Sequence, residues 1–113
     1  MSRLSPDKRM LEYALNDACS DIFAFSTTRH GGVSTGTYAS LNCTPYTGDP
    51  AENVLRNQKL LLEALPQRPQ ELVIPWQTHG TASLVIDTDY LQADPQTRHE
   101  RLQGIDALIT RER

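Results

Sequence analysis

Two short apolar runs joined by a polar segment make up the stretch Glu71-Leu-Val-Ile-Pro-Trp-Gln-Thr-His-Gly-Thr-Ala-Ser-Leu-Val-Ile-Asp87. The runs are rich in Val, Ile and Leu and are too short for independent helices, so the pattern predicts two strands. Their connection, Pro75-Trp-Gln-Thr-His-Gly80, is predicted to be a polar turn.

His79 lies in this turn beside Gly80. At a strand end an imidazole can be held rigidly, while the backbone of a glycine lets another group approach closely. These are the requirements of a metal ligand or a general base. A turn histidine that only forms a hydrogen bond has the same local sequence, and the hexapeptide alone favours that simpler interpretation.

Upstream, the chain from Gly31 to Gly48 is dense in Gly, Ser, Thr and Asn, which predicts a long irregular loop. Long ordered loops in compact domains are usually functional. The hydroxyls and backbone amides of this loop, with the Asn42 amide and the Arg29 guanidinium, suit a phosphate or a ribose. A surface connector whose glycine pair permits a tight turn fits the same composition.

The helix with the strongest local signal is predicted from Pro50 to about Leu65. Asp49-Pro-Ala-Glu52 has the pattern of a capping box with proline at the first helical position. Either Asn53 or Asn57, one turn apart, could reach back to fix the preceding loop, although solvated amides are commoner on helix faces. The apolar stripe of this helix is predicted to contain Val54, Leu55, Leu61, Leu62 and Leu65.

Three weaker elements complete the expected order. Apolar residues spaced from Met10 to Ala18 predict a helix with a start at Ser5-Pro6-Asp7, and aromatic residues predict a strand over Ile22–Ser26. The segment from Thr88 to Gln103 is polar, with little to bury and at most a short helix. Gly104–Thr110 is predicted to return as a strand.

These elements predict an α+β fold, a mixed β-sheet with flanking helices. We expect residues 1–113 to be the N-terminal part of a single domain that lacks its C-terminal part, because so few elements leave exposed sheet edges and a thin core.

The bulk composition excludes several classes of protein. Eleven basic against fourteen acidic residues, without a dense basic cluster, argue against a nucleic-acid partner. No apolar run is long enough to serve as a signal peptide or to span a bilayer, so we expect no membrane association and a cytoplasmic location. Cys19 and Cys43 lack metal or redox spacing and are expected to be reduced thiols.

Four motifs, taken in order, carry a resemblance to a known family. They are Phe25–Asn42, Gly48-Asp49, Gln77-Thr-His-Gly80 and Gly104–Thr110. From about Phe25 onward the chain resembles the N-terminal part of the laccase-domain family. Its members are also called multicopper polyphenol oxidoreductases, and in activity they resemble zinc-dependent purine nucleoside phosphorylases.

The resemblance implies phosphorolysis of adenosine, inosine or guanosine with phosphate, giving the free base and ribose 1-phosphate, and a possible companion adenosine deaminase activity. It implies that His79 is one of three zinc ligands, the others being a cysteine and a histidine beyond residue 113, so the chain alone is expected to be a poor catalyst or none. His79 and Arg29 are the expected catalytic residues. The expected substrate-binding residues are Ser26, Arg29, Asn42 and Gln77.

Two other functions stay open. Unpaired strand edges and a leucine-rich helix face would serve a non-catalytic interaction module. A copper-dependent polyphenol oxidoreductase is disfavoured, because a multicopper site needs many histidines and this chain has three. Convergence of Arg29, Asn42 and His79 on one cleft would favour the enzyme over the module.

Overall fold

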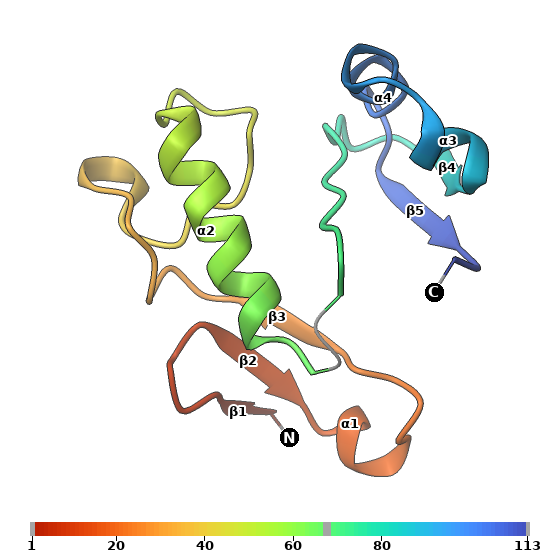
Figure 1. The fold of residues 1–113 in the computed structure, drawn as a ribbon. Helices are drawn as coiled ribbons and strands as arrows, with labels where there is room; N and C mark the ends of the chain where they lie inside the picture. The colour runs from red at the N-terminus through yellow and green to blue at the C-terminus, as the bar shows by residue number, and fades with distance from the viewer. Residues whose placement is uncertain (1, 67–68, 113) are drawn as a thin grey trace. The chain divides into compact units, whose positions relative to one another are not determined.

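The computed structural model describes residues 2–66 and 69–112, whose elements are labelled in Figure 1, and the chain divides into two compact units, the first ending at Leu72 and the second beginning at Val73. The predicted α+β class is confirmed, although the strands form two separate sheets. The first unit contains β1 (Ser2–Leu4), β2 (Met10–Tyr13), α1 (Leu15–Ala18), β3 (Phe25–Thr27), the 3₁₀ turn η1 (Gly36–Tyr38) and α2 (Ala51–Ala64). The second contains β4 (Ser83–Ile86), α3 (Thr88–Gln92), α4 (Pro95–Arg101) and β5 (Ala107–Thr110).

The first unit begins with an antiparallel sheet in the order β1-β2-β3, in which Leu4 pairs with Leu11 and Met10 with Thr27. The helix predicted through Met10–Ala18 is therefore wrong, because its first part is β2 and only the short α1 is helical. Strand β3 is confirmed, three residues later than predicted at its start.

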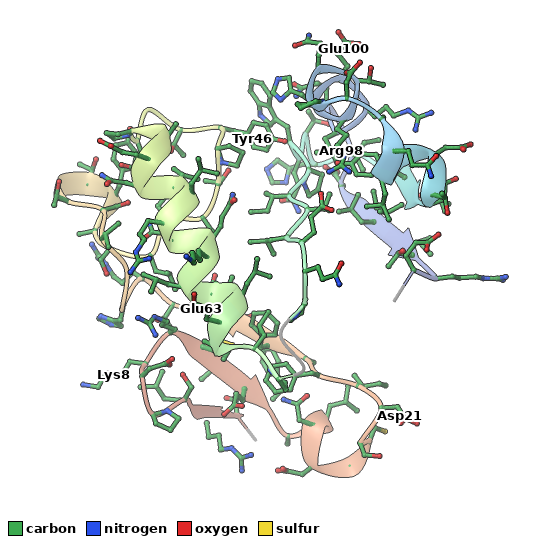
Figure 2. The ribbon with its side chains drawn as sticks, viewed as in Figure 1. Lys8, Asp21, Tyr46, Glu63, Arg98 and Glu100 are labelled. Atoms are coloured by element: carbon green, nitrogen blue, oxygen red, sulfur yellow. The ribbon has the colours of Figure 1, made fainter. Side chains whose placement is uncertain are left out.

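The turn between β1 and β2 explains the error. The amide of Ser5 donates to the carbonyl of Met10 at 2.8 Å, and Lys8, at the turn in Figure 2, has a φ of 64°. The Asp7 carboxylate accepts from the Ser5 hydroxyl at 2.6 Å and from the Arg9 amide at 3.0 Å. Ser, Pro and Asp are common both at helix starts and in turns, so Ser5-Pro6-Asp7 was interpreted as a helix start when it belongs to a turn.

Helix α2 confirms the predicted helix, but its predicted cap is wrong. The carboxylate of Asp49 accepts from the side chains of Ser34 and Asn42, and no side-chain cap bond closes the helix start. Val54 and Leu61 are buried as expected, whereas Leu55 is 64% exposed, so the apolar stripe is narrower than predicted. The irregular loop before α2 is confirmed, with η1 as its regular element.

The second unit contains a parallel sheet in which β4 pairs with β5, Leu84 opposite Leu108. The strand predicted before Trp76 is wrong, because this segment forms only an isolated bridge between Trp76 and Gln103. Pro75 has no N–H to donate to a ladder, which limits pairing at this point. The predicted strands at β4 and β5 are confirmed, each shorter than its sequence pattern.

The segment between β4 and β5 was predicted to contain at most a short helix, and this is wrong because it contains two; it was also predicted to bury little, and its buried residues are Tyr90 and Leu102. It forms α3 and α4, whose starts are capped by Asp87, accepting from Tyr90 N at 3.0 Å, and Asp94, accepting from Thr97 N at 2.7 Å. Tyr90 and Leu102 are buried with Ile86 in the core of this unit. The Arg98 guanidinium carbon lies 5.2 Å from the centre of the Tyr90 ring, and Figure 2 shows Arg98 in this part of the unit. None of the described helices is long and apolar enough to cross a membrane.

Candidate functional site

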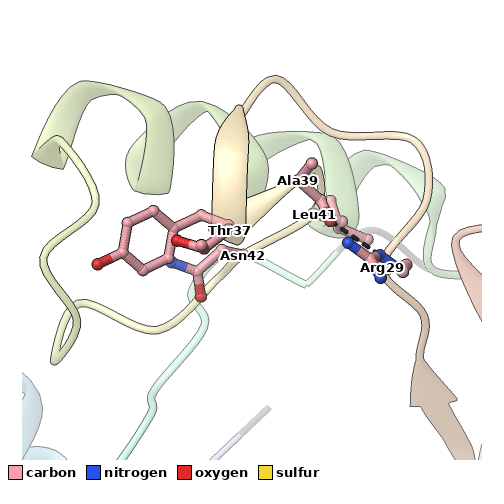
Figure 3. Close-up of a pocket in the computed structure, with 6 residues that line it drawn as sticks. Arg29, Thr37, Ala39, Leu41 and Asn42 are labelled. Carbon is pink, nitrogen blue, oxygen red and sulfur yellow. Dashed lines mark hydrogen bonds between the residues drawn. The ribbon is translucent and has the colours of Figure 1, made fainter.

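A pocket of about 350 Å³ opens in the first unit beside η1 (Figure 3). Small-molecule sites commonly fall between ~300 and 1,000 Å³, so its size suits a small polar ligand. The pocket combines one cationic side chain with hydroxyl, amide and apolar groups. All of them come from the segment that follows β3. Its lining consists of Arg29, Thr37, Tyr38, Ala39, Leu41 and Asn42.

Arg29 is held at this pocket by its backbone and by one side-chain bond. Its carbonyl accepts from the amides of Ser40, at 2.6 Å, and Leu41, at 3.0 Å. Its Nε donates to the carbonyl of Ala39 at 3.0 Å, the dashed line in Figure 3. Within residues 2–66 and 69–112 the terminal guanidinium nitrogens have no hydrogen-bond partner, so they remain available to an anion.

Asn42 shares the pocket with Arg29, but most of its amide is engaged within the loop. Its Nδ2 donates to Thr47 Oγ1 at 3.0 Å and to Asp49 Oδ2 at 3.2 Å, and its Oδ1 accepts from the Thr44 amide at 3.3 Å. An amide oxygen has two lone pairs, so Oδ1 can accept one further hydrogen bond.

Asn57 fixes the loop from underneath. This α2 side chain is fully buried, and its Oδ1 accepts from the Val33 amide at 2.8 Å. Its Nδ2 donates to the Ser34 hydroxyl and to the Asn42 carbonyl, each at 2.8 Å. Of the two alternatives left open for the asparagines of this helix, Asn57 therefore reaches back to the loop and is not a solvated amide. Three points of the loop are tied to one rigid helical position.

Ser34 and Asp49 extend this polar network. The Ser34 hydroxyl donates to Asp49 Oδ2 at 2.5 Å, and both residues are buried. On the next position of α2, the Gln58 amide donates to the carbonyl of Cys43 at 2.8 Å, and burial raises the pKa of the Cys43 thiol. Neither Ser34 nor Asp49 was among the predicted site residues, although Ser34 lies in the donor-rich loop and Gly48-Asp49 is among the motifs of the resemblance.

Ser26, also predicted to bind substrate, lies on β3 and does not line the pocket. Its hydroxyl pairs with the Tyr13 hydroxyl of the neighbouring strand at 2.5 Å. The structure therefore brings Arg29 and Asn42 together and gives Ser26 a partner on the sheet.

The second unit contains the predicted metal ligand, His79, and Gln77, both exposed. His79 has a φ of 60°, in the left-handed region. Its amide and that of Thr78 both donate to Asp106 Oδ1, at 3.2 and 2.8 Å. Among the described residues the His79 imidazole has no hydrogen-bond partner, so both ring nitrogens are open. Asp106 was not among the predicted site residues, although it lies in the Gly104–Thr110 motif.

A metal site needs more than this one imidazole. Catalytic zinc usually takes three protein ligands and keeps a fourth position open. No group of three His, Cys, Asp or Glu that could hold a metal occurs in the described part of the chain. His79 thus fits zinc as a single ligand, and the described residues do not complete a site.

The amino-acid sequence of this chain is similar to those of several known proteins. Residues 23–113 match the family described as multi-copper polyphenol oxidoreductase laccase. A purine nucleoside phosphorylase of Bacteroides thetaiotaomicron is 57% identical over 112 residues, covering 99% of this chain and 42% of the relative. A purine nucleoside phosphorylase of Haemophilus influenzae is 46% identical over 80 residues, covering 66% of this chain and 31% of the relative.

A third relative carries a different name. An adenosine deaminase of an unknown prokaryotic organism is 38% identical over 88 residues, covering 78% of this chain and 34% of the relative. The chain thus spans less than half the length of each of these relatives. No solved structure matches it.

Proposed function

Because this chain belongs to the multi-copper polyphenol oxidoreductase laccase family, we propose that the whole protein is a purine nucleoside phosphorylase. Its substrates are adenosine, inosine or guanosine together with phosphate, and its products are the free base and ribose 1-phosphate. The names of relatives at 57% and 46% identity support this activity.

The reaction breaks the bond between C1′ of the ribose and the purine nitrogen, and forms a bond from a phosphate oxygen to C1′. Positive charge builds on the ribose and negative charge on the leaving base, which takes up a proton as it departs. Fixed donors that hold phosphate against C1′ lower this barrier by positioning and by electrostatic stabilisation. The chain must therefore supply anion-binding donors that do not reorganise during the reaction.

The observation that carries the proposal is the open end of the Arg29 guanidinium at the pocket beside η1. Its Nε is fixed to Ala39, so the terminal nitrogens are presented at little cost in side-chain freedom. We assign to them the phosphate, or the ribose hydroxyls nearest to it. The Asn42 Oδ1 accepts a hydrogen bond from a substrate hydroxyl with its remaining lone pair. We also propose that Ser26 and Gln77 contact the substrate.

For the metal, we propose that His79 is one of three zinc ligands, and that a cysteine and a histidine outside this chain complete the set. The open ring nitrogens of His79 support its role. Zinc held there would supply a Lewis acid that orients a water, a phosphate or a substrate atom. The chain's own contribution is to hold the imidazole in place.

Adenosine deamination is proposed as a companion activity, supported by the name of the relative at 38% identity. It replaces the purine 6-amino group by oxygen from water and releases ammonia. Adenosine would then yield inosine, which phosphorolysis would cleave in turn.

The test uses the full-length protein and its Arg29→Ala, Arg29→Lys and His79→Ala variants. We expect zinc, not copper, in the purified protein, and phosphate-dependent release of base from adenosine. Arg29→Ala should raise the KM for phosphate on the order of 10-fold or more, with partial recovery in Arg29→Lys, because a lysine keeps the charge and loses the planar fork. His79→Ala should lose both zinc and activity.

Two outcomes would reject the proposal. Copper with oxidation of a phenolic substrate, and no release of base, would favour the polyphenol oxidoreductase. Absence of both metal and turnover, with stable capture of a partner protein, would favour the interaction module.

A further inference from the structure

The Asp106 carboxylate closes the turn that contains His79. One of its oxygens, Oδ1, accepts from two successive amides, those of Thr78 at 2.8 Å and His79 at 3.2 Å. The two partners lie 28 and 27 residues away along the chain, so this contact belongs to the tertiary structure of the unit. Asp106 is half-buried, which favours a carboxylate that is hydrogen-bonded over one that is fully solvated.

The backbone at His79 needs such support. Its φ of 60° lies in a region that residues with a Cβ rarely adopt. Without a fixed acceptor the residue would relax to the ordinary negative-φ region and the Cα–Cβ bond would leave the turn in another direction. Two charge-assisted hydrogen bonds to one oxygen stabilise the observed conformation against this relaxation.

Asp106 is itself anchored on both sides of the turn. Its amide donates to the carbonyl of Ala82 at 3.1 Å, just before β4. Two residues earlier, the Gly104 amide donates to the carbonyl of Trp76 at 2.9 Å, and Gly104 has a φ of 71°. Trp76 and Ala82, on either side of the turn that contains His79, are thus both hydrogen-bonded to the segment from Gly104 to Asp106.

We propose that Asp106 is a positioning residue for His79, which fixes the backbone of that residue so that its imidazole is presented as a metal ligand. This inference rests on the proposed role of His79 in zinc binding. In this role Asp106 touches neither the metal nor the substrate and acts through the amides of the turn.

The first experiment measures zinc affinity by competition with a chromogenic chelator, on the full-length protein and on Asp106→Ala, Asp106→Asn and His79→Ala. Asp106→Ala should weaken zinc binding on the order of 10- to 100-fold, the range found when residues that orient a metal ligand are removed. Asp106→Asn keeps an oxygen acceptor and should recover most of the affinity. In zinc-saturated protein, Asp106→Ala should lower kcat more than it raises the KM for adenosine.

Asp94→Ala is the matched control. Asp94 also accepts a backbone amide, that of Thr97 at 2.7 Å, and lies in the same unit, but it caps α4 and has no bond to the turn. Its variant should bind zinc as the wild type does. If Asp106→Ala fails to fold, Asp106→Glu replaces it, because it keeps the charge and displaces the carboxylate by one methylene.

The second experiment does not depend on the metal. Amide hydrogen exchange of Thr78 and His79 in the zinc-free protein should be faster in Asp106→Ala than in the wild type, and unchanged in Asp94→Ala. Wild-type zinc affinity in Asp106→Ala, or unchanged exchange at both amides, would overturn the inference. Wild-type zinc affinity in His79→Ala would instead reject the proposed ligand role of His79.

Discussion

A polar residue, Asn57, occupies the most buried position in the described part of the chain. Its side chain is fully buried, yet both of its N–H groups and its oxygen are hydrogen-bonded to the loop that lines the pocket. A buried amide whose hydrogen bonds are all formed contributes little net stability. Its removal, however, leaves its partners buried without a hydrogen bond, and each then costs its full desolvation free energy. Asn57 therefore determines the loop conformation more than it contributes apolar burial.

Replacement of Asn57 by alanine tests this role. It would leave the Val33 amide, the Ser34 hydroxyl and the Asn42 carbonyl each short of a partner, at about 1–3 kcal/mol for each such group. We expect the free energy of unfolding to fall by about 3–5 kcal/mol in urea denaturation, together with a raised KM for phosphate. Asn53→Ala, one turn earlier on α2, is the control and should change neither quantity appreciably. A near-neutral Asn57→Ala would contradict the network.

Asp7 predicts a pH dependence at the β1–β2 turn. Hydrogen bonds from the Ser5 hydroxyl and then from the Arg9 amide hold the pKa of the Asp7 carboxyl below its ordinary value of 3.8. The unfolded chain thus binds this proton more readily, so the stabilisation is complete above pH 3.8 and is lost as the pH falls through the lower, folded pKa. Asp7→Asn should show a smaller loss of stability between pH 5 and pH 3 than the wild type, measured by thermal unfolding. Equal losses in both proteins would refute it.

At the scale of elements, the sequence predicted α2, the irregular loop, β4 and β5, because each has a strong local pattern. It failed where one residue type serves two structures. Asp49 has the sequence of a helix cap, but the Ser34 and Asn42 side chains 15 and 7 residues away compete for its carboxylate and bind it. The helical content of the α3–α4 segment was underestimated, because its burial depends on a few residues, chiefly Tyr90 and Leu102, in a mostly polar sequence.

The loop and α2 approach each other so closely at Gly32 that no side chain fits there. A Cβ at this position would lie 2.2 Å from the Ser40 carbonyl oxygen and 2.6 Å from Asn57 Oδ1. Gly32→Ala should therefore displace the loop from the helix and abolish the pocket. We expect this variant to lose both cooperative unfolding in denaturation experiments and phosphate binding.

Gly36→Ala is the matched comparison on η1. Open space surrounds this position, but its φ of 64° is unfavourable for alanine, so we expect a cost of about 1–2 kcal/mol with the pocket intact. If the two variants were equally destabilised, the close approach of the loop to α2 would not be the reason why position 32 requires a glycine.

For the whole molecule, sequence reasoning identified the family and chose residues from both units. The donor-rich loop that contains Asn42 was predicted from its composition, whereas the role of Asp106 was not, because it depends on a contact across 27 residues. No local spacing encodes such a contact. The site assignments that involve zinc and substrate remain predictions for the variants described above.

Zinc stoichiometry separates the 113-residue chain from the full-length protein. With one proposed ligand and no described group of three, we expect the short chain to bind zinc weakly and to show no phosphorolysis. The full-length protein should bind one zinc per chain and turn over adenosine. Metal analysis after dialysis, with activity measured on the same samples, makes the comparison. Tight stoichiometric zinc in the short chain would contradict the proposed ligand set.

The parallel pairing of β4 with β5 also sets an order of events during synthesis. Ser83 pairs with Ala107, so β4 leaves the ribosome 107 − 83 = 24 residues before its partner does. At ~5–20 residues per second this is a delay of about 1–5 s, during which β4 lacks the strand with which it pairs in this structure. Over that interval nascent β4 is accessible to chaperones. Strands β1 and β2, by contrast, can pair as soon as the residues from Ser2 to Tyr13 have emerged. Crosslinking to chaperone should therefore peak for chains stalled after β4 emerges and fall once β5 follows.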